Sequence, residues 1–214
     1  MTVNAQDFIL FMLAGGKTPL PNLTERGKAA MSLPTGLTTE NAALVVIDIQ
    51  DRMMRVMNDK ERLLQNLQKL VKGMRVLEVP VILTEQYPAG LGPTLPELAQ
   101  LLPDIRPIEK LSFSCWGEDR FRQELEALKR QQVIIAGIEA HVCVYQTAMD
   151  LSRLGYEVHV AADCVSSRET ANKEVCLAQM SGAGISLTTT EMALFELLRV
   201  AQGDKFKQIS NIVK

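Results

Sequence analysis

The sequence predicts an α/β fold of three layers, α/β/α and Rossmann-like, around a mostly parallel sheet of six strands. From residue 42 to residue 200, short apolar runs alternate with longer segments of helical spacing. A continuous apolar run is typical of a strand that a parallel sheet buries on both faces. Alternating strands and helices form right-handed βαβ units, which place helices on both faces of the sheet. The length of 214 residues suits one domain with a sizeable core.

Six segments have the pattern of strands. The first, Ala43-Leu-Val-Val-Ile47, is continuously apolar, and the second carries Pro80 near its start, where no ladder hydrogen bond is lost. Gly137 is expected to end the fourth. The strands are predicted at residues 43–47, 79–83, 107–111, 133–136, 156–161 and 184–187.

Five segments have the pattern of helices. Leu63, Leu67, Leu70 and Met74 recur three or four positions apart, which places them on one helix face. Gly155 is a usual stop for the helix before it. The helices are predicted at residues 62–77, 121–128, 141–154, 169–180 and 191–200, with a loop rich in Pro and Gly at residues 87–96.

The first forty residues differ from the rest. They contain Gly15-Gly16 and three prolines, and an apolar stretch at residues 8–13 predicts a short helix before an irregular arm. We therefore divide the chain into an N-terminal arm, residues 1–40, and a domain, residues 41–214. An apolar segment of this kind can pack against a partner subunit.

Composition narrows the function classes. Hydrophobic residues make up 47% and charged residues 22%, and the formal net charge of -2 offers no basic excess for a phosphate backbone. No apolar run approaches the roughly 20 residues that cross a bilayer, and no Lys or Arg precedes the apolar stretch near residue 8. We expect a cytoplasmic protein with no nucleic-acid or membrane partner.

Cysteine and histidine usage argues against disulfides and metals. The four cysteines form no CxxC pair, and a buried small hydrophobe is the simplest interpretation of Cys115, Cys164 and Cys176. The two histidines, His141 and His159, have no metal-ligand spacing, and they leave few candidates for the base of a Ser-His-Asp triad. We expect neither a metal nor a cofactor.

Candidate catalytic residues follow three predicted strands, at the edge where parallel sheets bind ligands. Asp48 follows the first strand, and either a helix N-cap or a catalytic acid fits its position. Lys110 lies in the third strand, where it either extends its ammonium to water or pairs with Asp48. Cys143 follows the fourth strand and opens a helix.

The position of Cys143 favours a reactive thiol. A helix N-terminus offers free N–H groups and positive potential, and a cation such as Lys110 lowers a thiol pKa, so we expect a stabilised thiolate. His141 stands two residues earlier and would point to a different helix face. We expect it to be structural or to line a substrate pocket.

Three long segments carry a resemblance to a known family. They are residues 84–93 (Thr84-Glu-Gln-Tyr-Pro-Ala-Gly-Leu-Gly-Pro93), residues 137–143 and residues 158–168. With Asp48 and Lys110 in order, the chain from residue 42 to residue 200 resembles the isochorismatase-like hydrolase superfamily. Within it, the chain is most similar to isochorismatase-domain-containing proteins of poorly defined function.

The resemblance implies a cysteine hydrolase that acts on a small amide or a related C–N or acyl substrate through a covalent thioester. Cys143 would be the nucleophile of a triad with Asp48 and Lys110. The resemblance also implies a cis peptide bond between Ile138 and Glu139, an oxyanion hole formed by the N–H groups of Glu139 and Cys143, and a homo-oligomer. Nicotinamidases hold a metal with an Asp and several His residues after the second strand, and this chain has no histidine there. Metal independence is therefore expected.

The substrate and the activity are less closely constrained. Candidates for binding a small-molecule substrate are Gln50, Glu85, Gln86, Tyr87, Trp116 and His141. A non-catalytic scaffold or binding protein could retain the same fold. A redox or detoxifying thiol is a third interpretation, although spacing reveals no resolving cysteine.

Overall fold

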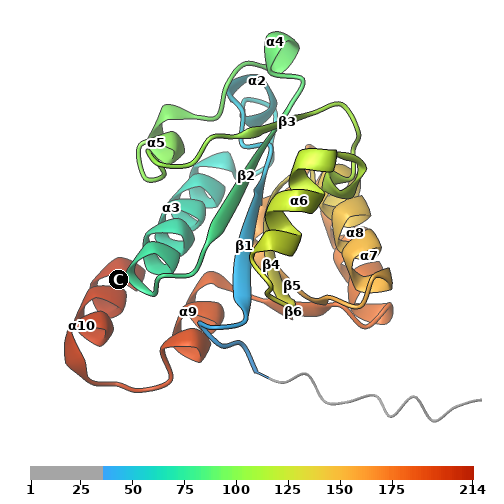
Figure 1. Ribbon diagram of the computed structural model, residues 1–214. Helices are drawn as coiled ribbons and strands as arrows, with labels where there is room; N and C mark the ends of the chain where they lie inside the picture. Colours follow the sequence, from blue (N-terminus) through green and yellow to red (C-terminus); the bar gives the residue numbers. More distant parts are fainter. Residues whose placement is uncertain (1–35) are drawn as a thin grey trace, which may run out of the picture. The chain divides into compact units, whose positions relative to one another are not determined.

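A computed structural model describes residues 36–214, and the part of the chain Gly36–Lys214 forms one compact unit (Figure 1). The predicted helix at residues 8–13 and most of the predicted N-terminal arm lie outside the described residues. The first described segment makes a turn through Thr38 and Asn41 and enters the first strand at Ala42.

A six-stranded sheet forms the centre of the molecule, and every pairing between its strands is parallel. The strand order β3-β2-β1-β4-β5-β6 reverses direction between β1 and β4, as in doubly wound folds. This confirms the predicted fold class. The strands are β1 Ala42–Ile47, β2 Val81–Gln86, β3 Ile108–Lys110, β4 Gln132–Ile138, β5 Glu157–Ser166 and β6 Ser186–Thr188.

Helices cover both faces of the sheet (Figure 1). Buried apolar residues of α3, α9 and α10 pack on one face, and those of α6, α7 and α8 pack on the other. The helices are α2 Asp51–Met54, α3 Lys60–Val76, α4 Pro88–Leu91, α5 Pro96–Ala99, α6 Asp119–Ala127, α7 Tyr145–Arg153, α8 Thr170–Gly182, α9 Thr190–Leu198 and α10 Gly203–Val213. Two short turns, the 3-10 turn η1 Cys115–Gly117 and the π-helical turn η2 Ala140–Val144, complete the elements.

Several boundaries differ from the sequence prediction. The second strand starts at Val81, two residues later than expected. Strand β5 continues to Ser166, and the prediction ended it too early because polar residues interrupt the apolar pattern that marks its start. The predicted helix at residues 141–154 begins as the π-helical turn η2 and continues as α7. Helix α10 was not predicted, since Ile209 is its only fully buried side chain.

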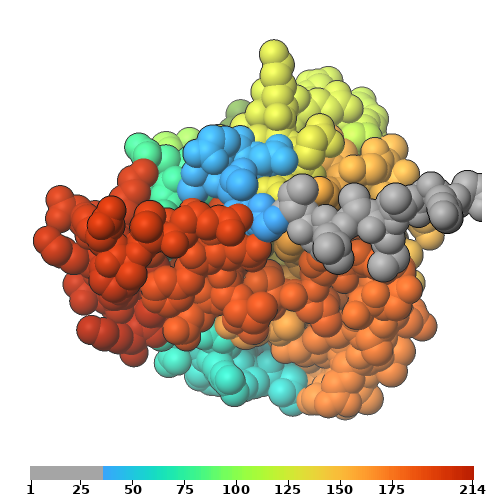
Figure 2. All heavy atoms as spheres, turned by 90° about the horizontal axis from the view of Figure 1, so that it is seen from below, coloured from blue at the N-terminus to red at the C-terminus, as the bar shows by residue number. Residues whose placement is uncertain are grey.

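The segment just before β1 is held by hydrogen bonds to residues of α9 and its C-terminal end. Leu37 N–H donates to Glu196 Oε1 at 3.1 Å, and Arg199 donates to Leu37 O at 2.9 Å, which fixes the chain before β1 against α9. Figure 2 shows this end of the molecule, with residues just before β1 in blue beside the red α9 and α10. In folds of this type ligands bind at the carboxyl ends of the strands, at the opposite edge of the sheet.

Gly137 was predicted to end its strand, but it lies inside β4. Its φ is +132°, and a Cβ atom there would lie 2.1 Å from Ile47 O of the neighbouring strand. Glycine is needed because β1 and β4 approach too closely for any side chain.

We expect Gly137→Ala to lower the free energy of unfolding by about 3 kcal/mol or more, because it adds a backbone clash to an unfavourable φ. Urea denaturation followed by circular dichroism measures this. Gly182→Ala is the matched control, since a Cβ atom there meets nothing within 4 Å. Equal unfolding free energies for the two variants would contradict the packing argument.

Candidate active site

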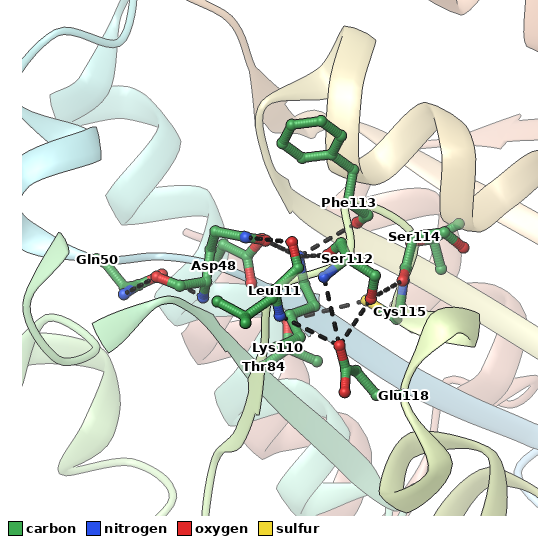
Figure 3. Close-up of polar contacts among 12 residues, drawn as sticks. Asp48, Gln50, Thr84, Lys110, Leu111, Ser112, Phe113, Ser114, Cys115 and Glu118 are labelled. Carbon is green, nitrogen blue, oxygen red and sulfur yellow. Dashed lines mark hydrogen bonds and ion pairs between the residues drawn. The ribbon is translucent and has the colours of Figure 1, made fainter. Parts of the chain in front are cut away.

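Three predicted catalytic residues come from the carboxyl ends of three strands. Asp48 directly follows β1, Lys110 is the last residue of β3, and Cys143 lies in η2 just after β4. Lys110 Nζ lies 2.7 Å from Asp48 Oδ2, and both side chains are fully buried (Figure 3). The N-cap of α2 is Gln50, so Asp48 is not a helix cap. Lys110 does not reach water either, and the paired interpretation holds for both residues.

The Lys110 ammonium has a complete set of acceptors. Beyond Asp48, it donates to Gln86 Oε1 at 2.7 Å and to the carbonyl oxygens of Ser112 and Phe113, each at 3.2 Å. Burial by itself lowers the pKa of Lys110, but the charge of the Asp48 carboxylate is the largest opposing effect, and the pKa is raised. Lys110 therefore stays charged in the interior.

The two oxygens of Asp48 have different partners. Oδ1 accepts a hydrogen bond from Thr84 Oγ1 at 2.7 Å. Oδ2 contacts Lys110 and, among the described residues, has no hydrogen-bond partner besides this ion pair. The backbone of Asp48 is left-handed, with φ of 56°, and its N–H donates to Thr84 O at 3.2 Å. Strand β2 thus holds both the backbone and the side chain of Asp48.

The surroundings of the Cys143 thiol oppose the expected thiolate. Its side chain is buried, with only 3% of the residue exposed. Burial first and the charge of Asp48 second raise the pKa of Cys143 to about 12, and Lys110 only partly opposes them. The expected lowering of this pKa was wrong because Asp48 already neutralises Lys110, and because α7 starts only after Cys143. Asp48 is the carboxylate beside this thiol.

We expect alkylation of Cys143 by iodoacetamide to be slow at pH 7–8 and to accelerate well above the ordinary thiol pKa of about 8.5. Lys110→Met should move the profile to still higher pH, because it removes the charge that lowers the pKa of Cys143. Asp48→Asn should move it to lower pH, because it removes a charge that raises that pKa. Mass spectrometry of the Cys143 peptide gives the rates. Shifts of the same sign in the two variants would contradict this electrostatic picture.

Three of the predicted substrate-binding residues form hydrogen bonds with neighbouring parts of the chain. Gln50 Oε1 accepts from Gln86 N–H at 2.7 Å, and Gln50 Nε2 donates to Gly92 O at 2.6 Å. Glu85 Oε1 accepts from both the N–H and the hydroxyl of Thr94, at 2.6 and 2.7 Å. Gln86 holds Lys110, as described above. These contacts fix the loop after β2, and direct contact of these side chains with a substrate stays a prediction.

The other three predicted substrate-binding residues lie in separate places. Tyr87 is 54% exposed and lines a cavity of about 320 Å³ at the end of β3. Trp116 packs edge-on against Tyr156, with ring centroids 6.4 Å apart. His141 Nδ1 lies 2.9 Å from Ser167 Oγ at the end of β5. Contact of these three side chains with a substrate stays a prediction.

Glu139 joins the ends of β4 and β5. Its carboxylate accepts from Arg168 N–H at 3.0 Å and pairs with Arg168 Nε at 3.2 Å. The peptide bond between Ile138 and Glu139 is cis. The role of the Glu139 N–H as an oxyanion donor stays a prediction.

Sequence reasoning missed three residues that build the site. Thr84 holds Asp48, and Glu118 Oε1 accepts from Leu111 N–H at 3.1 Å and Ser112 Oγ at 2.8 Å, which fixes the segment that binds Lys110 (Figure 3). Cys115 is fully buried with its Sγ 3.9 Å from Thr84 Oγ1, and burial raises its pKa to about 11. A polar Thr84 directly after the apolar residues 81–83 was the one available signal.

Residues 36–214 contain neither a cluster of metal ligands nor a membrane-spanning helix. No group of three His, Cys, Asp or Glu side chains is placed to hold a metal ion in this part of the chain. No helix among these residues is long and apolar enough to span a bilayer.

Comparison with known proteins identifies the family. Residues 42–192 match the model of the isochorismatase domain, which covers the sheet and the complete Asp48–Lys110–Cys143 site. The chain belongs to the isochorismatase family. A relative from Danio rerio, isochorismatase domain-containing protein 2, is 38% identical over 178 residues, which are 83% of this chain and 89% of the relative. The resemblance found in the sequence is thereby confirmed.

Two solved structures of similar chains extend this isochorismatase-family comparison. MAR1 ribonuclease from Caenorhabditis elegans has a TM-score of 0.79 and 36% identity, and the match covers 83% of this chain and 92% of that one. The YcaC gene product of Escherichia coli, described as an octameric hydrolase of unknown specificity, has a TM-score of 0.79 and 26% identity over 83% of this chain and 89% of that one. Membership in this family supports a hydrolase.

Proposed function

We propose that this member of the isochorismatase family is a cysteine hydrolase that cleaves a small amide, or a related C–N or acyl substrate, without a metal or cofactor. One observation carries the proposal: a fully buried Asp48–Lys110 pair lies beside the buried Cys143 thiol, at the carboxyl edge of a parallel sheet. Burying two charges is costly, and a site of this kind is a functional candidate because its groups perturb one another's pKa.

The first half of the reaction transfers the acyl group to the enzyme. As the Cys143 sulfur bonds to the carbonyl carbon, its proton passes to Asp48, and the carbonyl π electrons move to oxygen. Lys110 holds the carboxylate in place and balances the charge of the site. The N–H groups of Glu139 and Cys143 are the proposed donors to the oxyanion. The C–N bond then breaks, and the leaving nitrogen takes the proton from Asp48.

The second half releases the acyl group. Water attacks the thioester carbonyl, and Asp48 accepts its proton as general base. The C–S bond breaks, the sulfur regains a proton from Asp48, and a carboxylic acid leaves. This cycle balances with water as the only co-reactant. It also fits the raised pKa of the Cys143 thiol, since the thiolate is needed only while the sulfur attacks.

A library of small amides and esters tests the proposal. Hydrolysis of at least one, together with an acyl adduct located on Cys143 by mass spectrometry, is the expected result. Failure of every compound to acylate Cys143 would instead favour the binding-scaffold interpretation. The C. elegans relative is named a ribonuclease, so an RNA oligonucleotide belongs in the same screen. We expect no cleavage of RNA, because the net charge of -2 offers no basic excess.

We also propose that the protein is a homo-oligomer. The support is the description of the YcaC relative as octameric. Light scattering coupled to size-exclusion chromatography measures the mass directly. A mass of one chain, 23.7 kDa, would overturn this proposal.

A further inference from the structure

We propose that Thr84 is a positioning residue, which aims the Asp48 carboxylate at the Cys143 thiol. The inference rests on the proposed function and adds a fourth side chain to that site. Thr84 lies in the centre of β2 and is fully buried. Its hydroxyl is the hydrogen-bond partner of Asp48 Oδ1, at 2.7 Å.

The direction of this hydrogen bond is fixed by its surroundings. An ionised carboxylate only accepts hydrogen bonds, and a hydroxyl has a single proton, so Thr84 donates to Asp48. The Thr84 oxygen in turn accepts from the Cys115 thiol, at 3.9 Å. Cys115 is itself held to α7, because its N–H donates to Thr147 Oγ1 at 2.9 Å. Buried hydrogen bonds therefore link α7 through Cys115 and Thr84 to Asp48, with Cys115 donating to both threonines.

These hydrogen bonds separate the tasks of the two carboxylate oxygens. Oδ1 accepts from Thr84, while Oδ2 pairs with Lys110 Nζ at 2.7 Å and has no hydrogen-bond partner besides this ion pair among the described residues. That oxygen is therefore available for a proton from Cys143. Without the hydroxyl, the carboxylate could rotate, and both oxygens would compete for the Lys110 ammonium.

The test is the rate at which p-nitrophenyl acetate acylates Cys143, measured by p-nitrophenol release and located by mass spectrometry. Thr84→Val keeps the shape and removes the hydroxyl. We expect acylation to slow by between about tenfold and 100-fold, as for a misplaced general base. The wild-type rate should be lower in D₂O, because a proton moves with attack, and this isotope effect should shrink in Thr84→Val. Thr84→Ser should restore both.

Thr190→Val is the matched control. Thr190 is also buried and its hydroxyl lies 3.0 Å from a buried thiol, that of Cys164, but it begins α9, outside the site described above. We expect wild-type acylation and a wild-type isotope effect. Thermal unfolding checks that every variant is folded.

The outcomes separate the two proposals. A wild-type protein that is not acylated on Cys143 overturns the proposed function, and the role of Thr84 with it. A normal wild type with an unchanged Thr84→Val rate overturns only the role of Thr84. Equal losses in Thr84→Val and Thr190→Val, or no rescue by Thr84→Ser, would also overturn it, because both results point to general packing.

Discussion

Cys143→Ala is expected to abolish hydrolysis, with a fall in kcat on the order of 10⁴-fold or more, as when a catalytic nucleophile is removed. In the proposed mechanism the Cys143 sulfur makes the bond to the acyl carbon, so alanine leaves no nucleophile for the thioester. The fold should survive, since the thiol contributes little more than its own volume to the core. Steady-state kinetics on the best amide from the screen gives the fall, and circular dichroism confirms the fold.

Cys176→Ala is the control for this variant. Cys176 is 4% exposed and belongs to the same apolar cluster as Cys143, so the substitution removes a similar buried thiol. Its Sγ donates to Lys173 O in α8, at 3.1 Å. Full activity is expected. Residual hydrolysis in Cys143→Ala at the level of Cys176→Ala would exclude Cys143 as the nucleophile.

Lys110→Met should lower the free energy of unfolding by about 3–5 kcal/mol at pH 7, the usual cost of breaking a buried ion pair. Methionine has a similar length but carries no charge, so Asp48 would remain buried without its cation. The acceptors of Gln86, Ser112 and Phe113 would lose their donor as well. A fall in Tm of roughly 10 °C is expected for a domain of this size. Hydrolysis should be lost too.

The double variant Asp48→Asn with Lys110→Met separates stability from catalysis. It removes both charges while the asparagine oxygen can still accept from Thr84. We expect most of the lost stability to return, because no unpaired charge remains buried. Activity should not return, since the base is absent. A double variant no more stable than Lys110→Met would show that the ion pair is not the source of the effect.

The fold was predictable from sequence because burial on both faces leaves a clear apolar signal. The central strands β1 and β4 appear as runs dominated by Val, Ile, Leu and Ala, while the edge strands β3 and β6 are short and more polar. The parallel order follows from the alternation of strands with helices. The misplaced ends lie where the chain departs from that pattern. Gly137 has the composition of a stop, and only the distance to Ile47 O shows that it is a point of close approach.

The sequence was enough to predict which side chains lie together at the site, but not the raised pKa of the Cys143 thiol. Position after a strand was enough to bring Asp48, Lys110 and Cys143 together. The raised pKa of the Cys143 thiol depends on how deeply its side chain is buried and on the pairing of Lys110 with Asp48. Neither property can be read from one sequence. The same holds for Gln50 and Glu85, whose amide and carboxylate bind a loop that the sequence does not place.

The Asp48–Lys110 ion pair also has a consequence for how the sheet assembles. Strand β3 is only three residues long and lies at the edge of the sheet, with a single neighbour, β2. So short a strand has few ladder bonds to choose its alignment, and a slip by one residue would turn Lys110 to the opposite face. The ion pair reaches across β2 to β1 and penalises that slip. The charges to which we assign the chemistry thus also select the alignment of the edge strand, and a misaligned molecule would be compact but inactive.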